Sequence, residues 1–172
     1  MASSSLNLVL FHEVQYFRSI WFLAAVTGIT AIVWFAFVTQ VILGIPFGDN
    51  PGPDELIWFL IISFGTLFPI FLVTAHLTVE VRTDGIWLRF FPLHRRMWKI
   101  APDEFYSHEV ITYQIFRDYG GWGIRYGNKG TAYNVSGNRG VLLRFPRNKS
   151  IMIGSQHPED LNMAILSIRK GT

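Results

Sequence analysis

Two His-Glu pairs, His12-Glu13 and His108-Glu109, are the residues of this chain that most suggest metal chemistry. A zinc-protease motif needs a second histidine four residues after the first, so that both rings face one metal from one side of a helix. Those positions hold Tyr16 and Thr112, and the second pair falls in a strand-like alternation. The chain also has no cysteine, which excludes disulfides and thiolate ligands. We therefore expect no metal site.

A glycine-rich run between Gly120 and Gly130 invites comparison with nucleotide-binding loops. Gly121 and Gly123 have the first spacing of a dinucleotide fingerprint, but the next glycine, Gly127, comes one residue too late. No Gly-Lys-Ser/Thr sequence follows for a P-loop. These glycines are better explained as bulge and hairpin residues. The sequence predicts no bound cofactor, no catalytic residue and no enzyme activity.

The elements that must position any site begin with two long apolar runs. Ser19 to Leu43 has no charged residue over 25 positions, and Leu56 to Ala75 has none over 20. About 20 helical residues cross the hydrocarbon core of a bilayer. Core helices of soluble proteins are seldom apolar on every face for so long. Residues 19–78 are therefore predicted to form a transmembrane helical hairpin, with a short loop at residues 44–55 outside the cell.

The basic residues predict the orientation of this hairpin in the cell membrane. Of the 15 Lys and Arg residues, only Arg18 precedes Val79, and the loop between the two runs contains none. Positive residues are retained on the cytoplasmic side. We expect two spans, with both termini and the C-terminal half of the chain in the cytoplasm. No acid, base or histidine lies inside either run, so a proton or ion path is not expected.

Residues 1–18 form a separate N-terminal segment in this prediction. Leu6 to Phe17 is too short to span a bilayer, yet it is rich in apolar residues. We expect it to form an interfacial amphipathic helix. The alternative is that the first span begins early and carries His12 and Glu13 at its edge.

The remainder, residues 79–172, has the short alternating runs and frequent turns of an antiparallel β domain. Asp84-Gly85 predicts a tight hairpin, and further turn signals recur at roughly the 8–12-residue spacing of small sandwiches and barrels. The chain then changes period. Pro158 opens a helix with two acids in its first turn, and an apolar stripe follows at Leu161, Ile165 and Ile168. We expect a small barrel or sandwich closed by one amphipathic helix.

The run GVLLRFPRNKSIMIGS, followed directly by HPEDL, resembles the final strand pair and capping helix of bacterial pleckstrin-homology-like domains. More narrowly, GGWGIRYGNKGTAYNVSGNRGV is similar to a family of small prokaryotic two-span membrane proteins with no assigned function. The resemblance covers nearly the whole chain. It implies a transmembrane hairpin followed by a cytoplasmic pleckstrin-homology-like β-barrel or sandwich with a C-terminal capping helix. It implies no particular activity.

A basic cluster follows the second apolar run, and we consider it a candidate lipid-headgroup site. Its members are Arg82, Arg95, Arg96 and Lys99. Basic residues near a membrane surface are attracted to anionic lipid by about 1 kcal/mol each. In eukaryotic relatives of the resembling domains, phosphoinositides bind at the open barrel end beside the first strands. The alternative is that these bases only fix topology and solvate the domain.

An aromatic stretch in the β domain is the candidate protein interface. It comprises Tyr119, Trp122, Arg125, Tyr126 and Tyr133. Tyr, Trp and Arg are the residue types that dominate binding energy at interfaces. The alternative is that the rings belong to the core of the domain and leave one face exposed.

The function predicted from the sequence is a non-enzymatic, membrane-anchored interaction module. It would bind protein partners as an accessory or assembly subunit of a membrane complex. The second candidate is binding or sensing of anionic lipid headgroups. Membrane lipids and a membrane-protein partner are the expected ligands, and nucleic acid is not.

Overall fold

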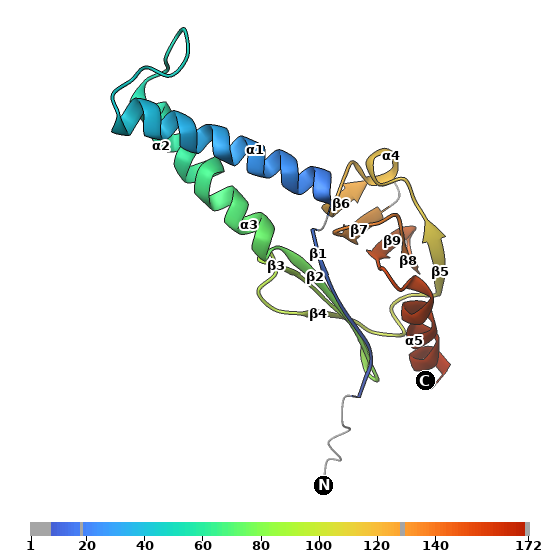
Figure 1. Cartoon of the computed structure of the whole chain (residues 1–172). Helices are drawn as coiled ribbons and strands as arrows, with labels where there is room; N and C mark the ends of the chain where they lie inside the picture. Colours follow the sequence, from blue (N-terminus) through green and yellow to red (C-terminus); the bar gives the residue numbers. More distant parts are fainter. Residues whose placement is uncertain (1–7, 18, 128–129, 171–172) are drawn as a thin grey trace. The chain divides into compact units, whose positions relative to one another are not determined.

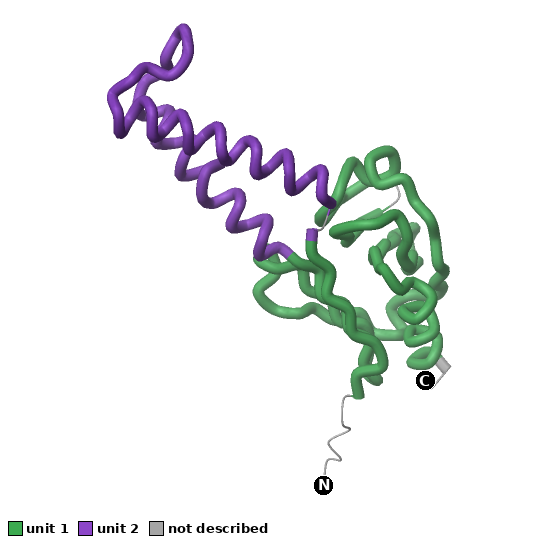
Figure 2. The backbone as a smooth tube through the Cα atoms, in the orientation of Figure 1, with its two compact units in different colours: residues 1–16, 76–172 green, residues 17–75 purple. Residues whose placement is uncertain are grey.

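The computed structural model describes residues 8–17, 19–127 and 130–170. The chain divides into two compact units (Figure 2). One is a helical unit, Phe17–Ala75, and the other is a β unit assembled from Met1–Tyr16 and His76–Thr172. The β unit thus contains segments from both sides of the helical unit.

The helical unit consists of two long helical segments. The first runs as α1 (Ile20–Ala36) and a π-helical turn, Phe37–Ile42, and the second as α2 (Asp54–Ile62), a π-helical turn, Ser63–Leu67, and α3 (Phe68–Thr74). These segments have 23 and 21 residues and are long and apolar enough to cross a membrane. Asp54 and Glu55 occupy the first turn of α2, where negative charge is favoured by the helix dipole.

The two helical segments meet at the second π-helical turn. A π turn leaves backbone carbonyls free of their usual helical partners, and here the carbonyl of Gly65 accepts a 3.1 Å hydrogen bond from Trp34 Nε1. A Cβ atom at Gly65 would lie 2.6 Å from Ile61 Cδ1. Ile61 belongs to the same helical segment and its Cδ1 is the end of a flexible side chain, so a small side chain at position 65 would require Ile61 to shift.

The first sheet of the β unit is an antiparallel meander of four strands (Figure 1). Its strands are β1 (Val9–Tyr16), β2 (His76–Arg82), β3 (Gly85–Phe91) and β4 (Trp98–Ile100), in that order across the sheet. Tyr16 at the end of β1 is paired directly with His76 at the start of β2. The whole helical unit is therefore inserted in the connection of a β-hairpin.

The interfacial helix expected over Leu6 to Phe17 is wrong for the part that the structure describes, which forms β1. Exposure along β1 alternates with period two, so that Glu13 and Gln15 are buried while Val14 and Tyr16 are exposed. These polar side chains can be buried because they have hydrogen-bond partners inside the β unit. Ser155 Oγ donates to Glu13 at 2.6 Å, and Gln15 Nε2 donates to the Gly154 carbonyl at 2.7 Å.

The second sheet has five strands and mixed direction. It contains β5 (Ser107–Thr112), β6 (Gly123–Gly127), β7 (Gly130–Asn134), β8 (Arg139–Phe145) and β9 (Lys149–Gly154), ordered β5-β8-β9-β7-β6. All pairs are antiparallel except β7 with β9. Among the described residues the two sheets do not join, so of the expected barrel or sandwich the closed barrel is wrong, and the strands form two separate sheets.

Two helices complete the β unit: α4 (Ile115–Tyr119) and α5 (Pro158–Lys170). The predicted C-terminal helix is confirmed, since α5 begins at Pro158 and buries Leu161, Ile165 and Ile168. It contacts strands of both sheets. The main core contains side chains from each sheet that are fully buried, among them Leu77, Val79, Val81, Leu88, Val141, Leu143 and Ile153.

The second sheet buries side chains on its other face as well. In its middle row, Leu142 of β8, Met152 of β9 and Ala132 of β7 lie side by side. They form a small apolar cluster with Tyr113 and with Ile115 and Tyr119 of α4. The strand β5 ends at Thr112, and the chain then turns into α4, which covers this face.

Candidate functional site

The two His-Glu pairs make structural contacts. His12 Nδ1 lies 3.2 Å from Glu80 Oε1, and His108 Nδ1 lies 2.7 Å from Asn162 Oδ1. Glu13 holds the segment before α5, and Glu109 forms an ion pair with Arg144. In the part of the chain that the structure describes, no three His, Asp or Glu side chains gather in a way that could hold a metal ion.

The basic cluster divides into two groups in the structure. Arg82 lies at the Asp84-Gly85 turn of the first sheet, about 20 Å along β2 from His76 at the strand rise of 3.4 Å per residue. Lys99 is paired with Trp87 in the middle of β4, and its side chain reaches Asp84 in this turn. Arg82 pairs with Glu80 at 2.6 Å, and Lys99 pairs with Asp84 at 2.9 Å. Both cations also lie over the ring of Trp87.

The charge of Asp84 is stabilised by these neighbours. Partial burial opposes its ionisation, but hydrogen bonds from Trp87 and Lys99 outweigh that effect and hold the pKa of Asp84 below its usual value. Arg82 and Lys99 thus already have carboxylate partners. They are poorly suited to attract an external anion.

Arg95 and Arg96 lie at the other end of the sheet, in the connection between β3 and β4. This connection leaves Phe91, which is paired with His76 where the chain leaves the helical unit. The rings of Tyr16, His76 and Phe91 form a row there, with successive centroids 5.3 Å apart. Both arginines are exposed, and so is Leu93, at 59%.

A shallow cavity of about 450 Å³ lies beside these arginines, and we call it the loop pocket. It is lined by Leu93, His94, Arg95, Arg96, Trp98 and Tyr133. Trp98 and Tyr133 contact each other through their rings, with centroids 5.5 Å apart. The loop pocket therefore combines two guanidinium groups with aromatic walls. Its aromatic wall from β7 could not be anticipated from the sequence, because Tyr133 is 37 residues from Arg96.

Only part of the aromatic stretch is available as a protein interface. Tyr119 and Tyr133 are buried, and Trp122 packs against the apolar cluster under α4. Arg125 and Tyr126 are exposed, and Tyr126 exposes 83% of its surface. The five residues do not form one exposed surface.

Phe116 is an exposed ring that the sequence analysis missed. It exposes 66% of its surface and makes an edge contact with Trp122, with centroids 5.1 Å apart. It lies on α4, which has only five residues and is too short to show a helical period in the sequence. The useful signal was Gly120, which has φ +76° and caps α4 in the left-handed conformation.

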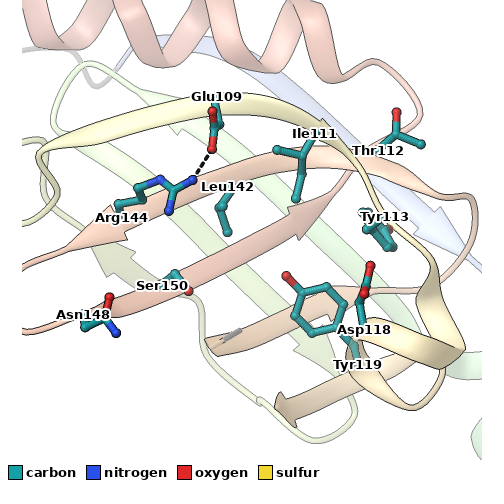
Figure 3. Close-up of a pocket in the computed structure, with 10 residues that line it drawn as sticks. All are labelled: Glu109, Ile111, Thr112, Tyr113, Asp118, Tyr119, Leu142, Arg144, Asn148 and Ser150. Carbon is teal, nitrogen blue, oxygen red and sulfur yellow. Dashed lines mark hydrogen bonds and ion pairs between the residues drawn. The ribbon is translucent and has the colours of Figure 1, made fainter. Parts of the chain in front are cut away.

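A second cavity, of about 420 Å³, opens on the face of the second sheet beside α4, and we call it the sheet pocket (Figure 3). Ile111 and Leu142 supply apolar surface from β5 and β8, and Tyr113 and Tyr119 form a wall. The polar side chains that line it include Glu109, Asp118, Arg144, Asn148 and Ser150. Tyr119 directs its hydroxyl toward the side formed by Leu142 and Ser150 (Figure 3).

Both tyrosines of the sheet pocket are protonated at neutral pH. Burial raises the pKa of Tyr113 to about 12. Burial also raises the pKa of Tyr119, and the neighbouring carboxylate of Asp118 raises it further. A neutral phenol can both donate and accept a hydrogen bond. The sheet pocket thus combines apolar surface with a few converging polar groups, which is the composition typical of ligand sites.

The fold and its surfaces define a small protein with two helices apolar enough to cross a membrane and a β unit formed by the segments before and after them in the sequence. The chain belongs to a family of unknown function (DUF6141), whose model matches residues 3–171. This agrees with the resemblance to an uncharacterised family that covers nearly the whole sequence. Comparison with curated proteins and with solved structures gives no match.

Proposed function

We propose that the protein is a non-enzymatic, membrane-anchored interaction module. In this proposal, the helices at residues 20–42 and 54–74 span the membrane, and the β unit is a pleckstrin-homology-like domain in the cytoplasm. Two sheets with a C-terminal helix that contacts both support the domain assignment. The charge asymmetry supports the orientation, with 14 of 15 basic residues after the second helix.

The orientation can be tested by cysteine labelling, which is free of background because the chain has no cysteine. In intact cells, an impermeant thiol reagent should label Asn50→Cys in the loop between the helices and leave Asn138→Cys, an exposed position of the β unit, unlabelled. Permeabilised cells provide the control, because both positions should then react. Labelling of position 138 alone in intact cells would show that the orientation is the opposite of the proposed one.

Binding of anionic lipid headgroups is the interaction that the geometry supports best. The observation that carries it is the position of Arg95, Arg96 and the exposed Leu93 at the end of the first sheet where the chain enters and leaves the helices. The connecting segments are short, since β2 begins two residues after α3 ends. In this proposal, Arg95 and Arg96 on the connection between β3 and β4 are therefore within reach of headgroup phosphates. Guanidinium groups bind phosphates in a bidentate manner.

The test uses the full chain in lipid nanodiscs, with a polarity-sensitive fluorophore on Leu93→Cys. In discs that contain anionic lipid, the emission should shift toward that of an apolar environment and shift back as salt shortens the screening length. Arg95→Gln with Arg96→Gln should weaken the surface-bound state about 30-fold, since each charge contributes about 1 kcal/mol near an anionic surface.

The matched control is Arg82→Gln with Lys99→Gln, which removes the same charge from the distant, ion-paired end of the sheet. This variant should keep the emission shift. Equal emission in neutral and anionic discs would refute lipid binding. An equal loss in both double variants would mean that only net charge matters.

A protein partner is the second candidate, and the exposed rings of Phe116 and Tyr126 favour it. Truncating an interface anchor costs about 2 kcal/mol or more, so Phe116→Ala or Tyr126→Ala should weaken copurification of a membrane partner about 30-fold. Gln114→Ala, an exposed neighbour, is the control. Trp122→Ala should instead lower the stability of the β unit, because Trp122 packs on the apolar cluster. A protein that purifies alone from its native membrane in mild detergent would contradict this second function.

A further inference from the structure

We propose that the sheet pocket binds a neutral, polyhydroxylated ligand of hexose size, either a free monosaccharide or the sugar headgroup of a glycolipid. This site lies on the second sheet and is distinct from the loop pocket. The proposal therefore does not depend on how the loop pocket functions.

The charges that line the sheet pocket favour a neutral ligand. Glu109 and Arg144 form an ion pair with each other at the rim (Figure 3). Asp118 lies 3.5 Å from Arg117 and also accepts a 2.9 Å hydrogen bond from the backbone N–H of Gln114. An ionic ligand would compete with these partners for the same groups. A neutral ligand leaves both arrangements intact.

The polar groups match hydroxyls, which donate and accept at the same time. Arg144 offers only donors, Glu109 offers only acceptors, and the amide of Asn148 offers both. The phenol of Tyr119 stays protonated at neutral pH, so it can also do both. Adjacent hydroxyls on one ring can use such a mixed set, whereas a purely donating or purely accepting ligand would leave part of it unpaired.

The remaining surface is apolar and suits the C–H face of a sugar ring. Ile111 and Leu142 contribute aliphatic surface, and Tyr119 contributes an aromatic ring beside it (Figure 3). The volume of about 420 Å³ lies near the lower end of the 300–1,000 Å³ typical of ligand pockets. It suits one or two sugar rings better than a large cofactor.

The test is saturation-transfer NMR on the full chain in nanodiscs, with the methyl glycosides of glucose, galactose and mannose as probes. The wild-type protein should transfer saturation to at least one of them. Tyr119→Phe and Asn148→Gly should each weaken its binding by up to about tenfold, as expected for the loss of one hydrogen bond. Asn148 has φ +59°, a conformation that glycine adopts without strain, so Asn148→Gly should preserve the turn.

Arg147→Gly is the matched control, because Arg147 has φ +60° in the same turn and does not line the pocket. It should bind like the wild type. Nanodiscs that carry a hexosyl diacylglycerol separate the two sources. If the site takes a glycolipid headgroup, this lipid should displace the soluble glycoside. If the site takes a free sugar, the glycoside should stay bound. The proposal is overturned if no glycoside and no glycolipid binds, or if Arg147→Gly loses as much affinity as Asn148→Gly.

Discussion

A chain in which a short turn replaces residues 17–75 is expected to fold as a soluble β unit. The reason is the pairing of Tyr16 with His76, which makes the helical unit an insertion in a β-hairpin. Antiparallel partners can be joined by turns of two to about four residues that contain Asn-Gly. Circular dichroism and cooperative thermal unfolding of this chain would measure the result.

The control is the simpler fragment that begins at Val79, the boundary that the sequence suggested. It lacks β1 and the first residues of β2, including Leu77, which is fully buried. It also leaves Ser155 Oγ and the Gln156 N–H without the carboxylate of Glu13. Losing a fully buried leucine costs about 2–5 kcal/mol, and the loss of β1 also removes a paired strand of the first sheet, so we expect this fragment to be unfolded. Equal stability of the two chains would show that β1 is dispensable.

The parts of the fold that could be predicted are those specified by local sequence. Each of these parts depends on residues that are close together in the sequence. They are the two apolar runs, the Asp84-Gly85 hairpin and the helix from Pro158. The strand β1 could not be identified in this way. Its polar residues Glu13 and Gln15 point inward toward Ser155 and Gly154, about 140 positions away, so its period-two pattern does not alternate between apolar and polar.

The candidate sites were limited by the same lack of long-range information. Composition identified Arg82, Arg95, Arg96 and Lys99 as one group, but strand direction places two of them at each end of the first sheet. Glu80 lies two residues before Arg82 on the same strand, so this pair is local, whereas Asp84 is 15 positions from Lys99 and their pairing depends on the register of the sheet. The sheet pocket was not predicted at all, because its walls come from β5, β8, β9 and α4.

Gly130→Ala is expected to destabilise the β unit by more than about 4 kcal/mol, an exceptional value for one methyl group. Two separate effects combine at this position. Gly130 has φ +102°, where a side chain is strained by about 1–3 kcal/mol. A Cβ atom would also lie 2.2 Å from the backbone oxygen of Ser150, which is part of β9. That contact would force apart the parallel strands β7 and β9.

Gly137→Ala separates the two effects. Gly137 has φ +79°, yet a Cβ atom there would meet no other atom within 4 Å. Its substitution should cost only the conformational strain, about 1–2 kcal/mol. Thermal unfolding of both variants in the full chain, followed by near-ultraviolet circular dichroism, would give the comparison. If Gly130→Ala is no more destabilising than Gly137→Ala, the close approach of β7 to β9 is not a constraint on this fold. A much larger loss at Gly130 would identify that approach as the reason for glycine at this position.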